Sequence, residues 1–108
     1  AMMTLAKDIY AITKTFPQNE LYALTSQIQR AVTSIPSNIA EGAGRPTTKE
    51  MVHFLSFSLG SAFELETEIT LAKEFNYITN GQYNELNDRI VEVQKLVYSL
   101  MKKYNENN

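Results

Sequence analysis

The chain has 108 residues, a length that closes one hydrophobic core, and we expect a single domain over residues 1–108. It contains no cysteine, which excludes a disulfide framework, a thiolate metal site and a cysteine nucleophile. With 10 basic and 12 acidic residues the net charge is −2, so nucleic-acid binding would depend on a local basic patch. No apolar run approaches the roughly 18 residues of a membrane span, and no signal sequence is visible, so we expect a cytoplasmic protein without membrane contact.

Two amphipathic helices are predicted in the first half of the chain, over residues 3–15 and 18–43. Pro17 separates them, because proline disfavours helical geometry in the residue before it. The first helix carries an apolar stripe with intervals of three and four residues: Leu5, Ile9, Ile12 and Phe16. The second carries the apolar seam Leu21, Leu24, Ile28, Ala31 and Ile35, beside a polar stripe of Gln27, Arg30, Ser34, Ser37 and Glu41.

Pro36 lies inside the second predicted helix, where it removes the hydrogen bond to the Val32 carbonyl. We expect a kinked but continuous helix, in which Ser34 or Ser37 compensates part of the lost bond. Two helices separated at Pro36 are the alternative. Gly42 and Gly44 are expected to end the helix, since glycine leaves a helix C-terminus at little steric cost.

A third helix is predicted over residues 47–75 and a fourth over residues 79–104. Each begins with a capping box, formed by Thr47 with Glu50 and by Thr79 with Gln82. The third helix has a core seam and, beside it, a second partly apolar stripe: Phe54, Phe57, Ser61, Glu64, Glu68, Leu71 and Phe75. A helix with two apolar faces buries more than one neighbour, which indicates an oligomer. The four helices predict an all-α, up-and-down four-helix bundle with a Pro-kinked second helix.

Few residues in the chain carry a chemical signal. His53 follows Glu50 by three residues, a spacing found in di-iron bundles, but such a site needs a second histidine and Glu50 is already explained as a cap. A metal-dependent enzyme is therefore a remote alternative, and we expect no catalytic residue, metal or cofactor. Glu64 and Glu68 lie one turn apart; a structural pairing of Glu64 with Arg30 is favoured over acid–base chemistry.

Two sets of cations remain. Arg45 stands between glycine and proline in an exposed turn, where it either binds a phosphate or carboxylate or pairs with Glu41. Lys95, Lys102 and Lys103 approach a cluster near the end of the fourth helix, a place where cations also suit the helix dipole.

A long motif supports a family resemblance. It comprises F-P at residues 16–17, E-L-Y-x-L-T-x-Q-x-x-R-A at residues 20–31 and S-I-P-S-N-I-A-E-G-x-G-R at residues 34–45, with a later E-L-E-T at residues 64–67. On these residues the chain resembles the four-helix-bundle proteins encoded in intervening sequences of bacterial 23S rRNA genes, which are also grouped as a ribosomal protein family.

The resemblance spans nearly the whole chain and implies a closed ring of subunits, a homopentamer, without known enzymatic activity. Related proteins include the retroelement accessory variability protein, whose pentamer binds nucleic acid and a reverse transcriptase. The family's structural or interaction motif carries over onto seven positions: Arg30, Asn38, Glu41, Gly42, Gly44, Arg45 and Glu64. The function we expect is that of a non-enzymatic accessory factor that binds RNA, DNA or a nucleoprotein. A protein-interaction scaffold without nucleic-acid contact is the alternative, motivated by the acidic net charge.

Overall fold

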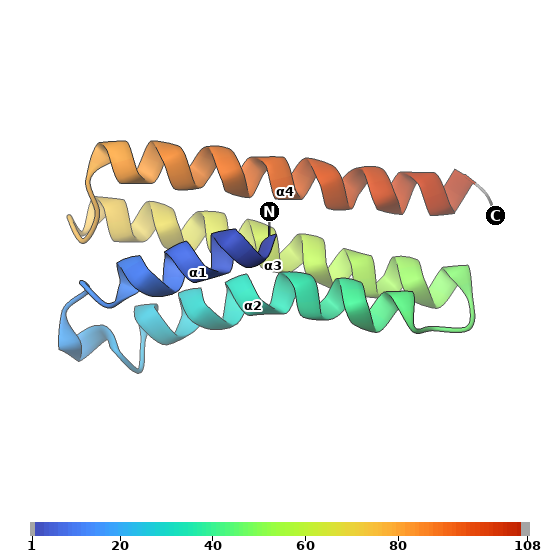
Figure 1. The fold of residues 1–108 in the computed structure, drawn as a ribbon, viewed down its shortest axis with the longest axis horizontal. Coiled ribbons are helices and arrows are strands. Elements are labelled where there is room, and N and C mark those ends of the chain that lie inside the picture. The colour runs from blue at the N-terminus through green and yellow to red at the C-terminus, as the bar shows by residue number, and fades with distance from the viewer. Residues whose placement is uncertain (1, 107–108) are drawn as a thin grey trace.

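The computed structural model describes residues 2–106 and contains four α-helices (Figure 1). The helices are α1 (Met2–Thr13), α2 (Leu24–Ala43), α3 (Thr48–Glu74) and α4 (Asn80–Glu106), and a short 3₁₀ helix, η1 (Gln18–Glu20), lies between α1 and α2. The predicted all-α four-helix fold is confirmed. No helix among the described residues combines the length and the apolar character needed to cross a lipid bilayer.

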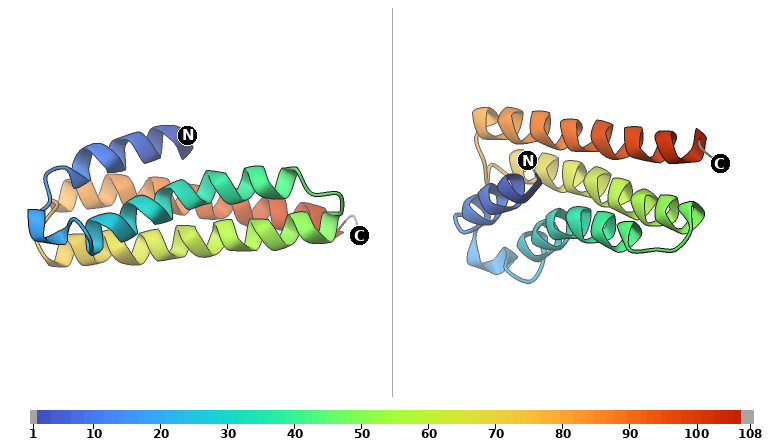
Figure 2. Two further views of the ribbon diagram at one scale, coloured as in Figure 1. Left: turned by 90° about the horizontal axis from the view of Figure 1, so that it is seen from below. Right: turned by 45° about the vertical axis from the view of Figure 1, so that its right-hand side comes forward.

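The helices run antiparallel to their neighbours along the long axis of a molecule measuring 46 × 24 × 19 Å (Figures 1 and 2). With 12 residues against 27 in α3 and α4, α1 covers only one end of the bundle. It packs against α2 and α4, while α3 also packs against α2 and α4. α1 and α3 therefore occupy opposite corners of the bundle.

One continuous core joins the four helices. Every helix contributes large, fully buried side chains: Leu5, Ile9, Ile28, Val32, Ile35, Leu65, Ile69, Ile90 and Val97. Burying one large aliphatic side chain stabilises the folded state by about 1.5–3 kcal/mol. The three-and-four periodicity of the sequence predicted all of these residues except Val32 as core positions.

The predicted start of the second helix at residue 18 is wrong, because α2 begins at Leu24. Residues 18–20 form η1 instead, and Leu21 and Tyr22, expected inside a helix, are 45% and 93% exposed. The chain is held in this turn by Tyr77, whose hydroxyl donates a 2.6 Å hydrogen bond to Glu20 Oε2. Glu20 thus contacts a residue that is distant in the sequence.

α2 is continuous through Pro36, as predicted, while the kink stays a prediction. The expected compensation by serine is wrong. Ser37 Oγ donates to the Thr33 carbonyl at 2.8 Å, and Ser34 Oγ bonds Ser61 Oγ of α3 at 2.8 Å, so neither hydroxyl reaches the Val32 carbonyl.

The connection between α3 and α4 contains the expected N-cap of α4 and one unexpected residue after α3. Thr79 and Gln82 form both bonds of the predicted capping box, at 2.9 and 3.1 Å. Asn76 follows the C-cap residue of α3, Phe75, and has a φ of 63°, while the amides of Asn76 and Tyr77 bond back to the carbonyls of Lys73 and Ala72. This is a Schellman motif with asparagine in the left-handed position, where asparagine is tolerated better than most residues.

Candidate interaction surface on α2 and α3

Two of the motif positions, Asn38 and Gly42, lie where α2 packs on α3. Ser58, fully buried on α3, donates from Oγ to the Ile35 carbonyl of α2 at 2.8 Å. One turn further along α3, Ser61 meets Ser34, whose Oγ also accepts a 2.8 Å bond from Asn38 Nδ2. Asn38 therefore contributes to the helix interface, by orienting a serine pair that joins α2 to α3.

Gly42 is required by the close approach of these two helices. A Cβ at this buried position would stand 3.0 Å from the Met51 carbonyl oxygen and 3.1 Å from Phe54 Cβ, both on α3. Gly44, by contrast, caps α2 with a φ of −86°, which any residue adopts, and its nearest neighbours lie at ordinary contact distance. α2 thus ends where it was predicted to end, with Gly44 as its C-cap, but the backbone there does not need a glycine. The steric restriction lies at Gly42 and comes from packing against α3.

Arg45 is engaged at this end of the bundle. Its guanidinium pairs with Glu41 one turn earlier and lies 4.7 Å from the centre of the Phe54 ring. Of the two alternatives left open by the sequence, the pairing with Glu41 is the one observed. Both partners remain substantially exposed, so this pair contributes little to stability.

His53 belongs to an aromatic cluster rather than to a metal site. Its ring lies 4.5 Å from that of Phe57 and 6.1 Å from that of Phe54, centre to centre. Glu50 caps α3: its amide donates to Thr47 Oγ1 at 3.1 Å and its carboxylate accepts from the same hydroxyl at 2.8 Å. Within residues 2–106, no three histidine or acidic side chains gather in a way that would hold a metal ion.

The predicted pairing of Arg30 with Glu64 is wrong. Both side chains are exposed, and over the described part of the chain no ion pair within 4.0 Å joins them. The buried acid is Glu68, one turn further along α3, which is 5% exposed. Glu68 lies three residues after Leu65 and four before Ala72, both fully buried, and that position relative to the core seam was the signal for its burial.

Glu68 has an unusual environment for a carboxyl group. Burial raises its pKa from the ordinary 4.5 to about 7; the charge of Glu64 and a hydrogen bond with Glu64 add to the rise, and Arg30 opposes it. Glu68 Oε1 is shielded from water and has no hydrogen-bond partner among the described residues. Acid–base catalysis needs a carboxyl that a substrate reaches, and Glu68 is closed off inside the helix pair.

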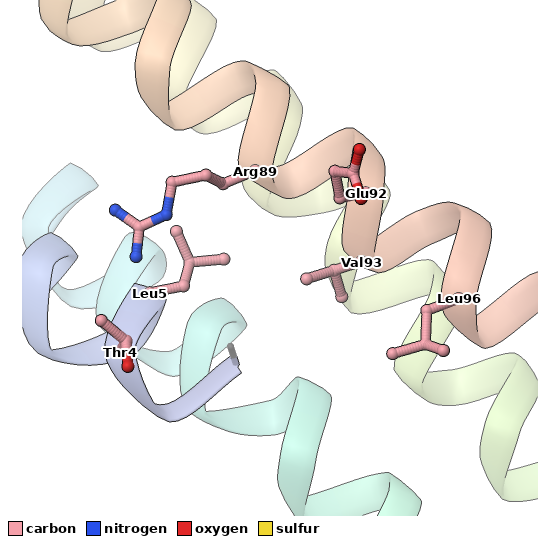
Figure 3. A pocket seen from close by; sticks show the side chains of 6 residues that line it. All are labelled: Thr4, Leu5, Arg89, Glu92, Val93 and Leu96. Atoms are coloured by element: carbon pink, nitrogen blue, oxygen red, sulfur yellow. The ribbon is translucent and has the colours of Figure 1, made fainter.

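A hollow between α1 and α4 is shown in Figure 3. The apolar side chains of Leu5, Val93 and Leu96 line it, with Thr4, Arg89 and Glu92 at its edges. Arg89 Nη1 donates to Asp8 Oδ2 at 2.8 Å and lies 3.8 Å from Glu85 Oε1. Arg89 at this hollow thus forms an ion pair that links α4 to α1.

Comparison with known proteins agrees with this architecture. The chain is similar to a protein of unknown function from the S23 ribosomal protein family of Bacteroides thetaiotaomicron VPI-5482, with a TM-score of 0.85 and 30% sequence identity over 94% of each chain. No curated protein matches it. The model of the family described as 23S rRNA-intervening sequence protein matches residues 1–99. On that match, the chain belongs to the 23S rRNA-intervening sequence protein family.

Proposed function

We propose that this protein is a non-enzymatic homo-oligomer that serves as an accessory factor for an RNA or a nucleoprotein. The observation that carries the proposal is the exposure of large apolar side chains along α3. Phe57, Phe63, Leu71 and the adjoining Phe75 are 48%, 51%, 41% and 52% exposed. Large apolar side chains exposed in this way often mark a surface that contacts another protein, so we infer that other subunits cover them. The family resemblance implies five of them.

The side-chain chemistry supports a role without catalysis. The group whose pKa is shifted most strongly toward neutrality, Glu68, is enclosed between α2 and α3. His53 faces aromatic rings, and its neighbour Glu50 is committed to a helix cap. These groups support structure rather than substrate chemistry.

RNA is the first candidate partner, because the family is named for intervening sequences of 23S rRNA. The exposed lysines Lys102 and Lys103 near the end of α4 offer the cations that phosphate contacts need. A structured RNA titrated by fluorescence anisotropy across a salt series tests this candidate. Each phosphate contact contributes roughly −0.9 to the slope of log K against log salt. The double variant Lys102→Glu with Lys103→Glu should flatten that slope, while Lys14→Glu at the end of α1 should leave it unchanged.

A protein partner is the second candidate, favoured by the state of the arginines. Arg45 and Arg89 are both engaged in ion pairs with carboxylates of the same chain, which lowers the positive charge available to phosphates. Absence of RNA binding even at low salt would overturn the first candidate and leave this one. In either case, light scattering should give a mass of several subunits, and a monomer would contradict the proposed assembly.

A further inference from the structure

Positive charge gathers in the C-terminal half of α4, the red end of that helix in Figure 1. Residues 93–105 contain three lysines and no aspartate or glutamate, whereas the whole chain has a net charge of −2. Lys103 lies over the ring of its neighbour Tyr104, 5.9 Å from the ring centre. Lys95 and Lys102 are exposed, and neither lies within 4.0 Å of a carboxylate among the side chains that the structure describes. These two cations are therefore available to phosphate groups.

Tyr98 lies between these two lysines on the same side of α4. Its side chain is 61% exposed. At about 100° per residue, Lys95 is rotated about 60° from Tyr98 around the helix, and Lys102 is rotated about 40° in the same direction. The two lysines are about 10 Å apart along the helix axis, at 1.5 Å rise per residue. A strand that follows α4 therefore meets a cation, an aromatic ring and a second cation in succession.

A hollow of about 270 Å³ lies on the C-terminal side of Tyr98, and Met101, Lys102 and Asn105 complete its lining. The lining groups are those that bind a nucleotide. The ring of Tyr98 can stack on a base, and the thioether of Met101 adds apolar contact. The amide of Asn105 both donates and accepts hydrogen bonds, as the edge of a base requires. All four residues belong to α4, so the hollow does not include the phenylalanines of α3 that the proposed assembly would cover.

We propose that this part of α4 is a binding site for single-stranded RNA. An unpaired base stacks on the ring of Tyr98 in the hollow, Asn105 bonds the edge of that base, and Lys95 and Lys102 contact the phosphates on either side of it. The bases of an RNA duplex are stacked on one another, so only an unpaired nucleotide can reach the ring. This inference rests on the proposed RNA function and specifies where the RNA binds and in which form.

The composition of the site favours a nucleic acid over a protein partner. Protein interfaces are depleted in lysine, whereas sites for single strands combine exposed aromatic rings with cations. An apolar protein surface placed over Tyr98 would remove water from the ammonium groups of Lys95 and Lys102 without replacing it by an opposite charge, which is unfavourable. A phosphate backbone supplies that opposite charge on both sides of the ring.

Substitution of Tyr98 tests the site. The probe is a labelled oligouridylate of about 12 nucleotides, a length within the range that single-strand sites cover, and a duplex RNA of the same length is compared with it. Tyr98→Ala should raise the dissociation constant for the single strand by about 5-fold or more in fluorescence anisotropy, because the stacked base loses its partner. Tyr98→Phe keeps the ring and should bind like the wild type. Tyr22→Ala removes another exposed tyrosine, in the turn before α2, and is the matched control.

A second measurement reports the position of the base. The chain contains no tryptophan, so Tyr98→Trp introduces a single indole at the site. Stacking of a base should quench the fluorescence of this variant when oligouridylate is added, whereas Tyr22→Trp should keep its fluorescence. Lys102→Ala should flatten the slope of log K against log salt by about 0.7, the value for one phosphate contact in a single strand, while Tyr98→Ala should leave the slope unchanged. Far-UV circular dichroism checks that each exposed substitution leaves the fold intact.

The outcomes separate this inference from the proposed function. If the wild type binds RNA but Tyr98→Ala binds the single strand equally well, or if Tyr98→Trp is not quenched, the assigned site is wrong while the RNA function stands. Equal affinity of the wild type for the duplex and the single strand would overturn the role of an unpaired base. If the wild type binds neither RNA at low salt, the site and the RNA function both fail, and a protein partner remains.

Discussion

The buried carboxyl of Glu68 should make the stability of this protein fall as pH rises. Its pKa in the folded protein is about 7, against 4.5 as its ordinary value. Between these pH values the folded protein holds a proton that the unfolded chain releases, so the free energy of unfolding decreases through this window. Below pH 4.5 both states are protonated, and above pH 7 the loss is complete.

The size of the effect follows from the same values. Multiplying the rise from 4.5 to about 7 by 1.36 kcal/mol per pKa unit gives an upper bound of about 3 kcal/mol. Glu68→Gln removes the ionisation and keeps a side chain of nearly the same size and shape. Relative to the wild type, this variant should therefore gain about 1–3 kcal/mol between pH 4.5 and pH 8.

Urea unfolding at several pH values measures this gain. All samples need one protein concentration, because self-association adds to the apparent stability. Glu74→Gln, exposed on the same helix, is the control and should leave the pH dependence of the wild type unchanged. A difference between Glu68→Gln and the wild type that stays constant from pH 4.5 to pH 8 would refute the reasoning.

Three further substitutions test the packing and the caps. Gly42→Ala should destabilise by about 1–3 kcal/mol relative to Gly44→Ala, because only the first Cβ meets the α3 backbone, and equal unfolding midpoints would contradict that reason. Tyr77→Phe removes the bond to the charged acceptor Glu20 and should lower the urea unfolding midpoint. Thr79→Ala should cost about 1 kcal/mol by loss of the N-cap of α4, and an unchanged melting temperature would mean that this cap is dispensable.

The sequence predicted those parts of the fold that depend on local periodicity. The apolar stripes of α3 and α4 recur every three or four residues over seven turns, and the cap at Thr79 lies next to the helix it starts. The start of α2 was missed because Leu21 continues the same periodicity, while the turn is held by Tyr77, more than fifty residues away. A contact between residues so far apart in the sequence cannot be recognised from the local spacing of apolar residues.

The motif includes residues of α2 that contact α3, but the sequence did not identify their partners. The predicted pairing of Arg30 with Glu64 assumed that both side chains turn inward. At about 100° per residue, Glu68 is rotated some 40° from Glu64 around α3, and that rotation separates a buried carboxyl from an exposed one. Gly42 was identified for its backbone freedom, whereas the approach of α3 is what requires it. Such distances depend on how two helices cross, which periodicity does not specify.

In an isolated bundle, large apolar side chains are expected to face the core and small ones the surface. Around α3 the serines face α2, while two phenylalanines face outward. Toward α2, the helix presents small residues, Ser58 and Ser61, which let the backbones approach and bond through hydroxyl groups. Its phenylalanines, which would bury the most apolar area, point outward at Phe57 and Phe63 instead. Small side chains inside and aromatic ones outside make sense together if the outer surface of α3 is itself interior in the assembled protein. The small residues then allow each subunit to fold with closely packed helices. The aromatic side chains stabilise the protein only when a neighbouring copy covers them.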